Sequence, residues 1–462
     1  MPVLSPRAHF IALAACVALI LGFADKGKIS GDGLLRWNAL VELMEHHRLT
    51  DGKYSILQPI AAAPLYAVAD ATRRMSHPGE TADERVAGIR KVVQRFNKFV
   101  VLALVLLFYR ASRTHFGLSA RQGVGGVALL LFGSFLIPHS RDFYSECLWT
   151  TLSLAALVLV CTLRAGPDGT RRRAGALVVV TALATAMNPL LAPVHLGASL
   201  VAGFLATRSA TAREGIARLF RAIRSAEVRW TVAGVALGAA LCLLENELRR
   251  GAALDFGYGG EGFTTPVWIG LPGMLIAPAR GLVFFVPTVF LGIALARRPP
   301  RGFPAAATTL TLVGLAYSAL LVAAYSTWHA WHGAWYWGPR FLLPVSVLGV
   351  AWAVLALRYA WADASPLARG WMVALVVASV LVYKCGVAIG PGPLVRCLEA
   401  AAREDDCYWR LEFLPYAPYW RLGNLASMAQ HPSTAVEIVG LLLLGTVAAA
   451  APGANARRTG GQ

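Results

Sequence analysis

The chain has 462 residues, of which 56% are hydrophobic and only 15% are charged. A soluble domain carries about a quarter charged residues. These charges are too few to cover a water-soluble surface of this size, so lipid must solvate much of the exterior. The formal net charge of +18 does not indicate nucleic-acid binding, because the basic residues lie in short runs between apolar stretches. Such runs are typical of membrane orientation signals and contacts with anionic headgroups.

Apolar stretches that are long enough to cross a bilayer recur along the whole chain. A crossing helix needs about 20 mostly apolar residues, or fewer where neighbouring helices help. The first stretch is interpreted as a retained helix rather than a signal peptide, because no small-residue cleavage pattern follows it. We therefore predict an all-α polytopic transmembrane helical bundle of about 12 spans in a single membrane domain, 1–462. The predicted spans are 8–24, 97–110, 123–138, 143–163, 174–188, 190–206, 229–248, 281–297, 304–325, 340–358, 370–388 and 434–451.

A thirteenth apolar stretch, 55–71, contains Pro59, Pro64 and Asp70, and its position decides the orientation of every later helix. If it does not cross and the N-terminus is cytoplasmic, the connections that carry more arginine than acid all lie in the cytoplasm, as the positive-inside rule requires. If it does cross, each later basic connection lies outside. We therefore predict that this stretch is an interfacial helix or a re-entrant segment on the outer surface.

Three long connections then face outward. The first contains LLRWNALVELMEHH, in which Leu35, Leu40 and Leu43 recur near helical spacing, and this pattern predicts an amphipathic helix along the membrane. The last contains Cys397 and Cys407, which would form a disulfide if that loop faces an oxidising space. The predicted outer loops are 25–96, 249–280 and 389–433.

Polar residues gather at the outer helix ends and in the outer loops, whereas the helix centres contain almost no charge apart from His195. This distribution argues against an ion-coupled transporter, because transporters place ionisable groups and broken helices near the midplane. It favours an enzyme whose site lies at the outer membrane surface. The gathered residues are Asp32, Asp142, Glu146, Asn188, Glu245, Glu247, Asp255, Glu261, Arg280, His329, His332, Arg340, Glu404, Asp405 and Asp406.

Five motifs occur in order between about residues 25 and 420: SGDG, YSILQPIAAAPLYAVA, SRDFYSE, GLPGMLIAPARGLVFFVP and WHAWHGAWYWGPRFLLPV. Together they resemble the C-type (GT-C) membrane glycosyltransferases, most closely the bacterial branch related to dolichyl-phosphate-mannose protein mannosyltransferases. The resemblance implies a GT-C-like fold. It also implies transfer of a sugar from a polyprenyl-phosphate carrier to a glycan, lipid or protein acceptor outside the cytoplasm, with inversion. The family's catalytic base is an Asp of the first loop, which Asp32 matches.

Inverting transfer requires a base for the acceptor hydroxyl and cations for the phosphate. We predict that Asp32 is the base, the alternative being an ordinary Asp-Gly turn. Asp142 and Glu146 are four residues apart at a predicted helix start, so they would share a face if both are helical, and they are expected to form a second acidic site. The alternative is that they only stabilise the helix N-terminus. We predict no cofactor and no metal, although metal-dependent members of the family use acids in both loops.

Cations and aromatic residues in the outer loops are the candidate substrate ligands. Arg340 is predicted to hold the phosphate, unless it only anchors its helix in the headgroups, and Arg280 is a similar candidate. The tryptophan-rich loop is either an interfacial aromatic belt or a wall that stacks on the sugar. The predicted substrate- and phosphate-binding residues are Arg340, Arg280, Lys53, Tyr54, His329, His332 and Trp337.

The sequence thus predicts a polyprenyl-phosphate-sugar-dependent glycosyltransferase that transfers a hexosyl or pentosyl group. Its expected partners are the lipid-linked donor, membrane lipid and the acceptor, with no nucleic acid. The Ala- and Arg-rich composition favours a bacterial plasma (inner) membrane, with a cytoplasmic N-terminus and the active site on the outer face. The main alternative is a transporter or flippase for lipid-linked sugars, and a third is a non-catalytic assembly protein. The sequence does not specify which sugar is transferred or which acceptor receives it.

Overall fold

The computed structural model describes residues 4–24, 27, 29–163, 170–207, 215–333, 336–401, 404–420 and 422–452. Every regular element in these ranges is helical, which confirms the predicted all-α helical bundle. Seven helices in these ranges are long and apolar enough to cross a membrane, and four shorter apolar helices accompany them. The total of about 12 spans stays a prediction.

The seven long apolar segments are α1 (Pro6–Phe23), α4 with α5 (Ala82–Val93 and Phe96–Thr114), α12 (Ala226–Arg250), α16 (Ala305–Ser326), the continuous segment η2–α17–η3 (Arg340–Leu342, Leu343–Leu355 and Ala356–Ala360), α18 (Pro366–Ala388) and α22 (Pro432–Ala449). The shorter apolar helices are α6 (Ala120–Phe132), α8 (Glu146–Thr162), α10 (Leu191–Ala206) and α13 (Val267–Ile276). The remaining α-helices are α2 (Gly31–His46), α3 (Leu57–Ser76), α7 (Leu136–His139), α9 (Thr170–Met187), α11 (Gly215–Ile223), α14 (Leu282–Phe285), α15 (Val289–Arg297), α19 (Gly392–Ala400), α20 (Glu404–Tyr408) and α21 (Leu422–Gln430).

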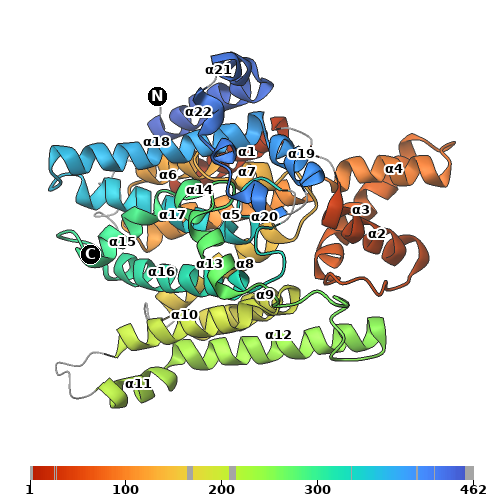
Figure 1. Ribbon diagram of the computed structural model, residues 1–462, viewed down its shortest axis with the longest axis horizontal. Helices are drawn as coiled ribbons and strands as arrows, with labels where there is room; N and C mark the ends of the chain where they lie inside the picture. The colour runs from red at the N-terminus through yellow and green to blue at the C-terminus, as the bar shows by residue number, and fades with distance from the viewer. Residues whose placement is uncertain are drawn as a thin grey trace.

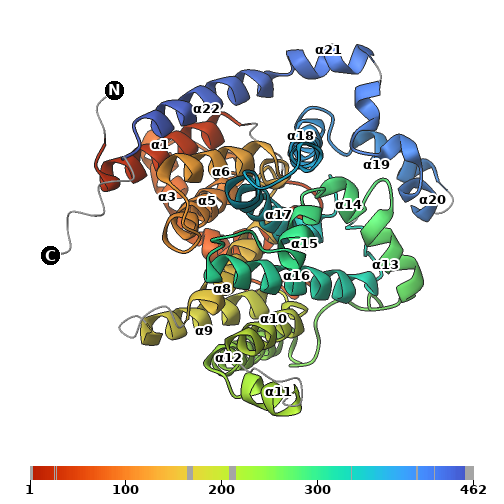
Figure 2. The ribbon, with the colours of Figure 1, turned by 90° about the vertical axis from the view of Figure 1, so that its left-hand side faces the viewer.

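Helix α17 is the centre of the bundle (Figure 2). It packs against α6, α8, α15 and α16, and all its residues are buried. A helix that is apolar on every face is stable only where protein or lipid surrounds it, and here protein does. Because η2 begins at Arg340 and leads directly into α17, a fully buried helix fixes the position of that arginine.

The predicted first outer loop folds into three helices, α2, α3 and α4, which lie together at one end of the molecule (right in Figure 1). Arg85 of α4 joins them by binding Glu45 of α2 at 2.7 Å and the carboxylate of Asp70 in α3. Tyr66 adds a 2.5 Å hydrogen bond to Glu45. Helix α3, which contains the stretch 55–71, is not among the candidate spans in the described ranges.

Two predicted spans are not continuous helices. The span 281–297 divides into α14 and α15 because Val286 leaves the helical conformation, and Pro287 has no N–H to continue the hydrogen-bond ladder. The span 123–138 is also interrupted, since α6 ends at Phe132 and α7 begins at Leu136. Residues 249–280 and 389–433, predicted only as outer loops, contain the helices α13, α19, α20 and α21.

Candidate functional site

The SGDG motif forms the start of α2 and lies against the SRDFYSE motif. Gly31 has a φ of +50°, and a Cβ there would lie 2.7 Å from the hydroxyl of Tyr144. A Cβ added at Gly33 would lie 3.3 Å from the backbone of Phe143. Glycine relieves both restrictions, so the two segments meet closely. Asp32 therefore sits in the first turn of α2, where the partial positive charge of the helix N-terminus favours a carboxylate.

Three motifs that are distant in sequence meet at Arg340. Its Nη1 binds Asp32 Oδ2 at 2.8 Å, and its Nε lies 3.6 Å from Glu146 Oε1. The side chains of Arg340 and Glu146 are only 10% and 6% exposed, whereas that of Asp32 is 26% exposed. One buried guanidinium thus lies between two carboxylates, and the more accessible of these is Asp32.

Arg36, which the sequence analysis did not select, belongs to the same cluster. Its guanidinium donates to the Asp32 carbonyl oxygen at 3.2 Å and to Ser145 Oγ at 3.0 Å, and it lies 4.0 Å from the ring centroid of Tyr54. Arg36 is four residues after Asp32 in a helix, so the two share a face. That spacing was a readable signal once SGDG was assigned to a helix rather than to a turn.

Charge at this cluster controls the ionisation of Asp32. Burial raises the pKa of Asp32, but the guanidinium groups of Arg340 and Arg36 outweigh burial and hold that pKa below its usual value. For Tyr54, burial and the neighbouring Asp32 carboxylate raise the pKa of the phenol well above its usual value. The site therefore combines an ionised carboxylate with a protonated tyrosine near neutral pH.

The cluster lines a cavity of about 710 Å³. Six of the predicted site residues line it together: Asp32, Lys53, Tyr54, Glu146, His329 and Arg340. Apolar side chains form another part of the wall, including Leu254, Phe256, Phe263 and Trp328. A pocket of this size with converging polar groups on an apolar wall is typical of a ligand site.

On another side of the cavity, Glu261 accepts hydrogen bonds from Lys53 Nζ at 2.7 and 2.8 Å. His329 Nε2 lies 3.8 Å from the same carboxylate. Trp328 beside it meets the rings of Tyr258 and Phe263 edge-on, at 5.4 and 5.3 Å between centroids. A paired cation and carboxylate next to aromatic faces can bind hydroxyl-bearing ligands.

The C-terminal end of α12 holds the segment that carries Lys53 and Tyr54. Arg249 donates to the carbonyl oxygens of Thr50, Gly52 and Tyr54 at 2.6, 2.8 and 2.7 Å. Glu245, which Arg249 also binds, accepts from Ser55 Oγ and from the backbone N–H of residue 56, both at 2.8 Å. The irregular segment after α2 is thus fixed by charged groups of a distant helix.

Asp142 does not line the cavity. It precedes α8, which begins at Glu146, so Asp142 is not helical and does not share a helical face with Glu146. Its carboxylate instead accepts from Ser30 Oγ at 3.3 Å. Burial raises the pKa of Asp142 to about 6, and its backbone oxygen accepts from Asn97 at 2.5 Å. Asp142 therefore lies behind the SGDG segment.

Arg280, His332 and Trp337 also lie outside the cavity lining. Arg280 donates to the carbonyl oxygens of Tyr336 and Gly338 at 2.5 and 3.2 Å, and burial lowers its pKa to about 10. His332 Nδ1 shares a 2.6 Å hydrogen bond with the Tyr408 hydroxyl, and burial lowers the pKa of His332 to about 3. The Trp337 ring packs edge-on against Phe285, with centroids 5.5 Å apart. These three side chains support the loop before Arg340.

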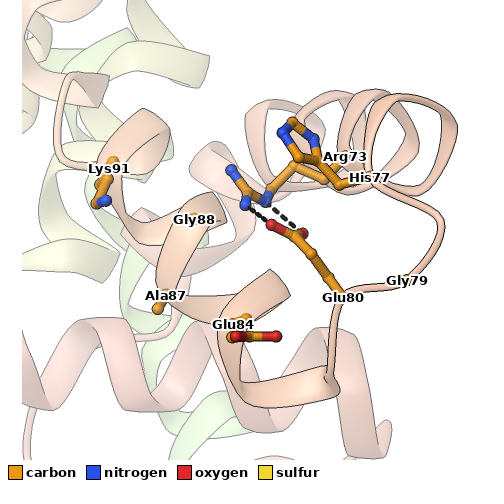
Figure 3. Close-up of a pocket in the computed structure, with 8 residues that line it drawn as sticks. All are labelled: Arg73, His77, Gly79, Glu80, Glu84, Ala87, Gly88 and Lys91. Carbon is orange, nitrogen blue, oxygen red and sulfur yellow. Dashed lines mark hydrogen bonds and ion pairs between the residues drawn. The ribbon is translucent and has the colours of Figure 1, made fainter.

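A second hollow, of about 540 Å³, lies between α3 and α4 (Figure 3). Arg73 and Glu80 pair across it, with a 3.0 Å hydrogen bond from Nε to Oε2. None of the predicted site residues lines it. Over the described residues, no group of three or more His, Cys, Asp and Glu side chains is arranged to hold a metal ion. Trp335 and the side chains of Glu404 and Asp405 lie outside what the structure describes.

No protein-family model and no curated protein matches this sequence. Two crystal structures of ArnT from Cupriavidus metallidurans are similar in fold. The structure bound to undecaprenyl phosphate has 14% sequence identity and a TM-score of 0.50, over 96% of this chain and 77% of that chain. The apo structure has 14% identity and a TM-score of 0.48, over 96% and 75%. The chain is thus a multi-pass membrane protein with an ArnT-like fold.

Proposed function

We propose that this chain is a glycosyltransferase that moves a sugar from a polyprenyl-phosphate carrier to an acceptor, with inversion. The observation that carries the proposal is the Asp32–Arg340–Glu146 cluster in the wall of a 710 Å³ cavity. Two further observations support it. The motif order resembles the C-type glycosyltransferases, and the structurally similar ArnT was crystallised with undecaprenyl phosphate. The proposal also assigns the chain to the bacterial branch of these enzymes that is related to dolichyl-phosphate-mannose protein mannosyltransferases.

The cluster has the groups that the reaction needs. The acceptor oxygen attacks the anomeric carbon, the bond from that carbon to the phosphate oxygen breaks, and polyprenyl phosphate leaves as an anion. Asp32 takes the proton of the acceptor hydroxyl, while Arg340 and Arg36 stabilise the departing phosphate. Glu146 remains beside Arg340 and balances its charge.

Donor binding prepares Asp32 for this role. Without donor, the Arg340 guanidinium binds Asp32 at 2.8 Å and keeps its pKa below the usual value. A phosphate that binds Arg340 competes for the same donors and supplies its own negative charge. The pKa of Asp32 then rises, because a neighbouring anion disfavours a second one. Asp32 becomes a stronger base only when the donor is in place.

We also propose that the site faces the non-cytoplasmic side of a bacterial plasma membrane, with the N-terminus in the cytoplasm. The Cys397–Cys407 disulfide supports this, because disulfides persist in oxidising compartments. Helix α11, which carries Arg218 and Arg221, lies at the opposite end of the molecule from α2, α3 and α4 (Figure 1). Basic segments favour the cytoplasmic side. In this orientation 25–96, 249–280 and 389–433 are the outer segments.

The decisive experiment uses the full chain in proteoliposomes with a polyprenyl-phosphate sugar labelled in the sugar. We expect labelled acceptor and free polyprenyl phosphate, and Asp32→Asn should reduce turnover by about 10²- to 10⁴-fold. The Asp32→Asn protein should still bind undecaprenyl phosphate, since Arg340 is retained. Asp51→Asn, in the exposed loop after α2, is the matched control and should keep full activity.

Full activity of Asp32→Asn would exclude Asp32 as the base. Movement of intact donor across the bilayer, without cleavage of the sugar–phosphate bond, would favour a transporter or flippase instead. Donor binding with neither movement nor turnover would favour a non-catalytic protein of the same fold.

A further inference from the structure

The Cys397–Cys407 disulfide joins α19 to α20, outside the cavity that contains Asp32 and Arg340. Cys407 is fully buried, and so is Tyr408, the next residue. A disulfide limits the conformations that its closed loop can take. It therefore restricts where Tyr408 can lie.

Tyr408 contacts two separate loops. Its hydroxyl shares a 2.6 Å hydrogen bond with His332 Nδ1, and the two rings stack with centroids 4.4 Å apart. Its carbonyl oxygen accepts from the backbone N–H of Ala279 at 3.1 Å. The Arg280 guanidinium lies 5.6 Å from the Tyr408 ring centroid. Tyr408 thus packs between the loop before α14 and the loop before η2.

Both loops lead to Arg340. Arg280 Nη1 donates to the carbonyl oxygens of Tyr336 and Gly338, the second of which is two residues before Arg340. Gly333 has a φ of +76°, and a Cβ there would lie 2.9 Å from Arg340 Cγ. The backbone before Arg340 therefore depends on Arg280, and Arg280 depends on the Tyr408 ring for part of its buried environment.

We propose that Tyr408, held by the Cys397–Cys407 disulfide, is a positioning residue for Arg340, so that reduction of the disulfide weakens phosphate binding while the helical bundle stays folded. The effect on binding rests on the proposed function, whereas the mechanical link from Tyr408 to Arg340 does not. Reduction by a dithiol delivers two electrons and two protons. The products are two cysteine thiols and the oxidised, cyclic reagent, and α20 loses its covalent link to α19.

The link is tested by hydrogen–deuterium exchange on the full chain in lipid nanodiscs. Residues 332–342 should exchange faster in Cys397→Ala/Cys407→Ala and in Tyr408→Leu than in the unmodified protein, while residues 343–355 stay protected. Tyr408→Phe retains the ring and should show a smaller change. Arg410→Gln is the matched control, because Arg410 belongs to the same segment but its exposed side chain pairs with exposed Glu412, and exchange in this variant should be unchanged.

The functional consequence is measured with undecaprenyl phosphate as the probe in the same nanodiscs. A shift of the Arg340 loop should weaken binding by about 10-fold or more, because charge-assisted hydrogen bonds to phosphate depend steeply on distance and angle. Dithiothreitol should weaken binding to the unmodified protein and leave the double cysteine variant unchanged. In the transfer assay, the loss should appear mainly as a higher KM for the donor.

The outcomes separate the two proposals. Unchanged exchange of residues 332–342 in both Tyr408→Leu and the double cysteine variant would overturn the positioning role. Faster exchange with unaltered undecaprenyl phosphate affinity would overturn its link to binding. If the unmodified protein does not bind the probe at all, the proposed function fails, and the exchange experiment still decides whether Tyr408 positions the loop. Loss of protection of residues 343–355 in the double variant would mean that its helical bundle is no longer intact. The positioning role is then judged from the exchange of Tyr408→Phe and of the unmodified protein after reduction.

Discussion

Asp32 and Arg340 are 308 residues apart in the chain and form a 2.8 Å ion pair. The pair joins the first turn of α2 to the residue that opens the central helical segment. It is partly accessible, since the Asp32 side chain is 26% exposed, so a ligand in the cavity can reach it. An anionic ligand can therefore replace Asp32 as the partner of the Arg340 guanidinium.

The first prediction concerns pH and stability. The pKa of Asp32 is lower in the folded protein than its usual value, so its ion pair stabilises the fold above the unfolded-state pKa of about 4. This contribution is lost as pH falls through the folded pKa. The unfolding temperature of the unmodified protein should exceed that of Asp32→Asn at pH 6. The difference should shrink as the pH falls below about 4 and vanish only below the lower folded-state pKa. When Arg340→Met is present in both proteins, burial becomes the main influence on the Asp32 carboxylate. The protein with Asp32 should then unfold at the same temperature as Asp32→Asn at pH 6, or at a lower one. A difference that grows as the pH falls from 6 to 4 would contradict the assigned pKa direction.

Glu146→Gln should separate donor binding from catalysis. Glu146 Oε1 lies 3.6 Å from Arg340 Nε, so removing this charge leaves Arg340 with only one carboxylate and increases its attraction for phosphate. We expect an unchanged or lower KM for the donor and a kcat lowered by about 10-fold or more, because a phosphate held too tightly leaves slowly. Steady-state kinetics measures both. Glu42→Gln, which breaks only an exposed pair with Arg48, should alter neither; a raised KM with normal kcat in Glu146→Gln would count against the assignment.

Arg36→Gln should impair the site through several contacts at once. The change removes the hydrogen bond to Ser145, the contact with the Tyr54 ring and one of the two cations that lower the pKa of Asp32. We expect kcat/KM to fall by about 10-fold or more, which corresponds to a loss of about 1.4 kcal/mol or more of transition-state stabilisation. Arg48→Gln is the control, since Arg48 follows the same helix and is mostly exposed. Equal activity of the two variants would remove Arg36 from the site.

Gly31→Ala tests the close contact between SGDG and SRDFYSE. A side chain at Gly31 is strained by its φ of +50° and meets the Tyr144 hydroxyl at 2.7 Å. The strain of a left-handed conformation alone costs about 1–2 kcal/mol, so the unfolding temperature and kcat should both fall. Gly79→Ala is a fair comparison, because a Cβ at Gly79 has no neighbour within 4 Å. A variant at Gly31 as stable and active as that at Gly79 would show that the contact is loose.

Helix periodicity and charge placement were sufficient to predict the general fold. The apolar stretches predicted a helical bundle, and six of the selected residues line one cavity because the segments that carry them converge in the fold. The break at Val286 was missed because an apolar stretch with a single Pro287 still looks like a span by composition. Whether a proline interrupts a helix depends on local packing, which composition does not record.

The side chains that lie outside the cavity show what sequence reasoning lacked. Arg280 resembles Arg340 in sequence, since each lies next to a glycine or a proline near the end of a predicted span. In the structure Arg280 binds two backbone carbonyl oxygens, which is a role that only the folded loop reveals. Asp142 would share a face with Glu146 only if the helix began before residue 143, but α8 begins at Glu146 and Phe143 packs in the core ahead of it. Arg36 was overlooked because the spacing of Leu35, Leu40 and Leu43 accounted for the whole segment as an amphipathic helix.

The most direct test of the central claim is a cryo-electron microscopy structure of the full chain in nanodiscs with undecaprenyl phosphate. The proposed function predicts density for the phosphate in the 710 Å³ cavity, within hydrogen-bonding distance of the Arg340 guanidinium, with the contact between Arg340 and Asp32 lengthened. Phosphate density only elsewhere, such as in the hollow beside Arg73, with the 2.8 Å pair intact, would contradict it.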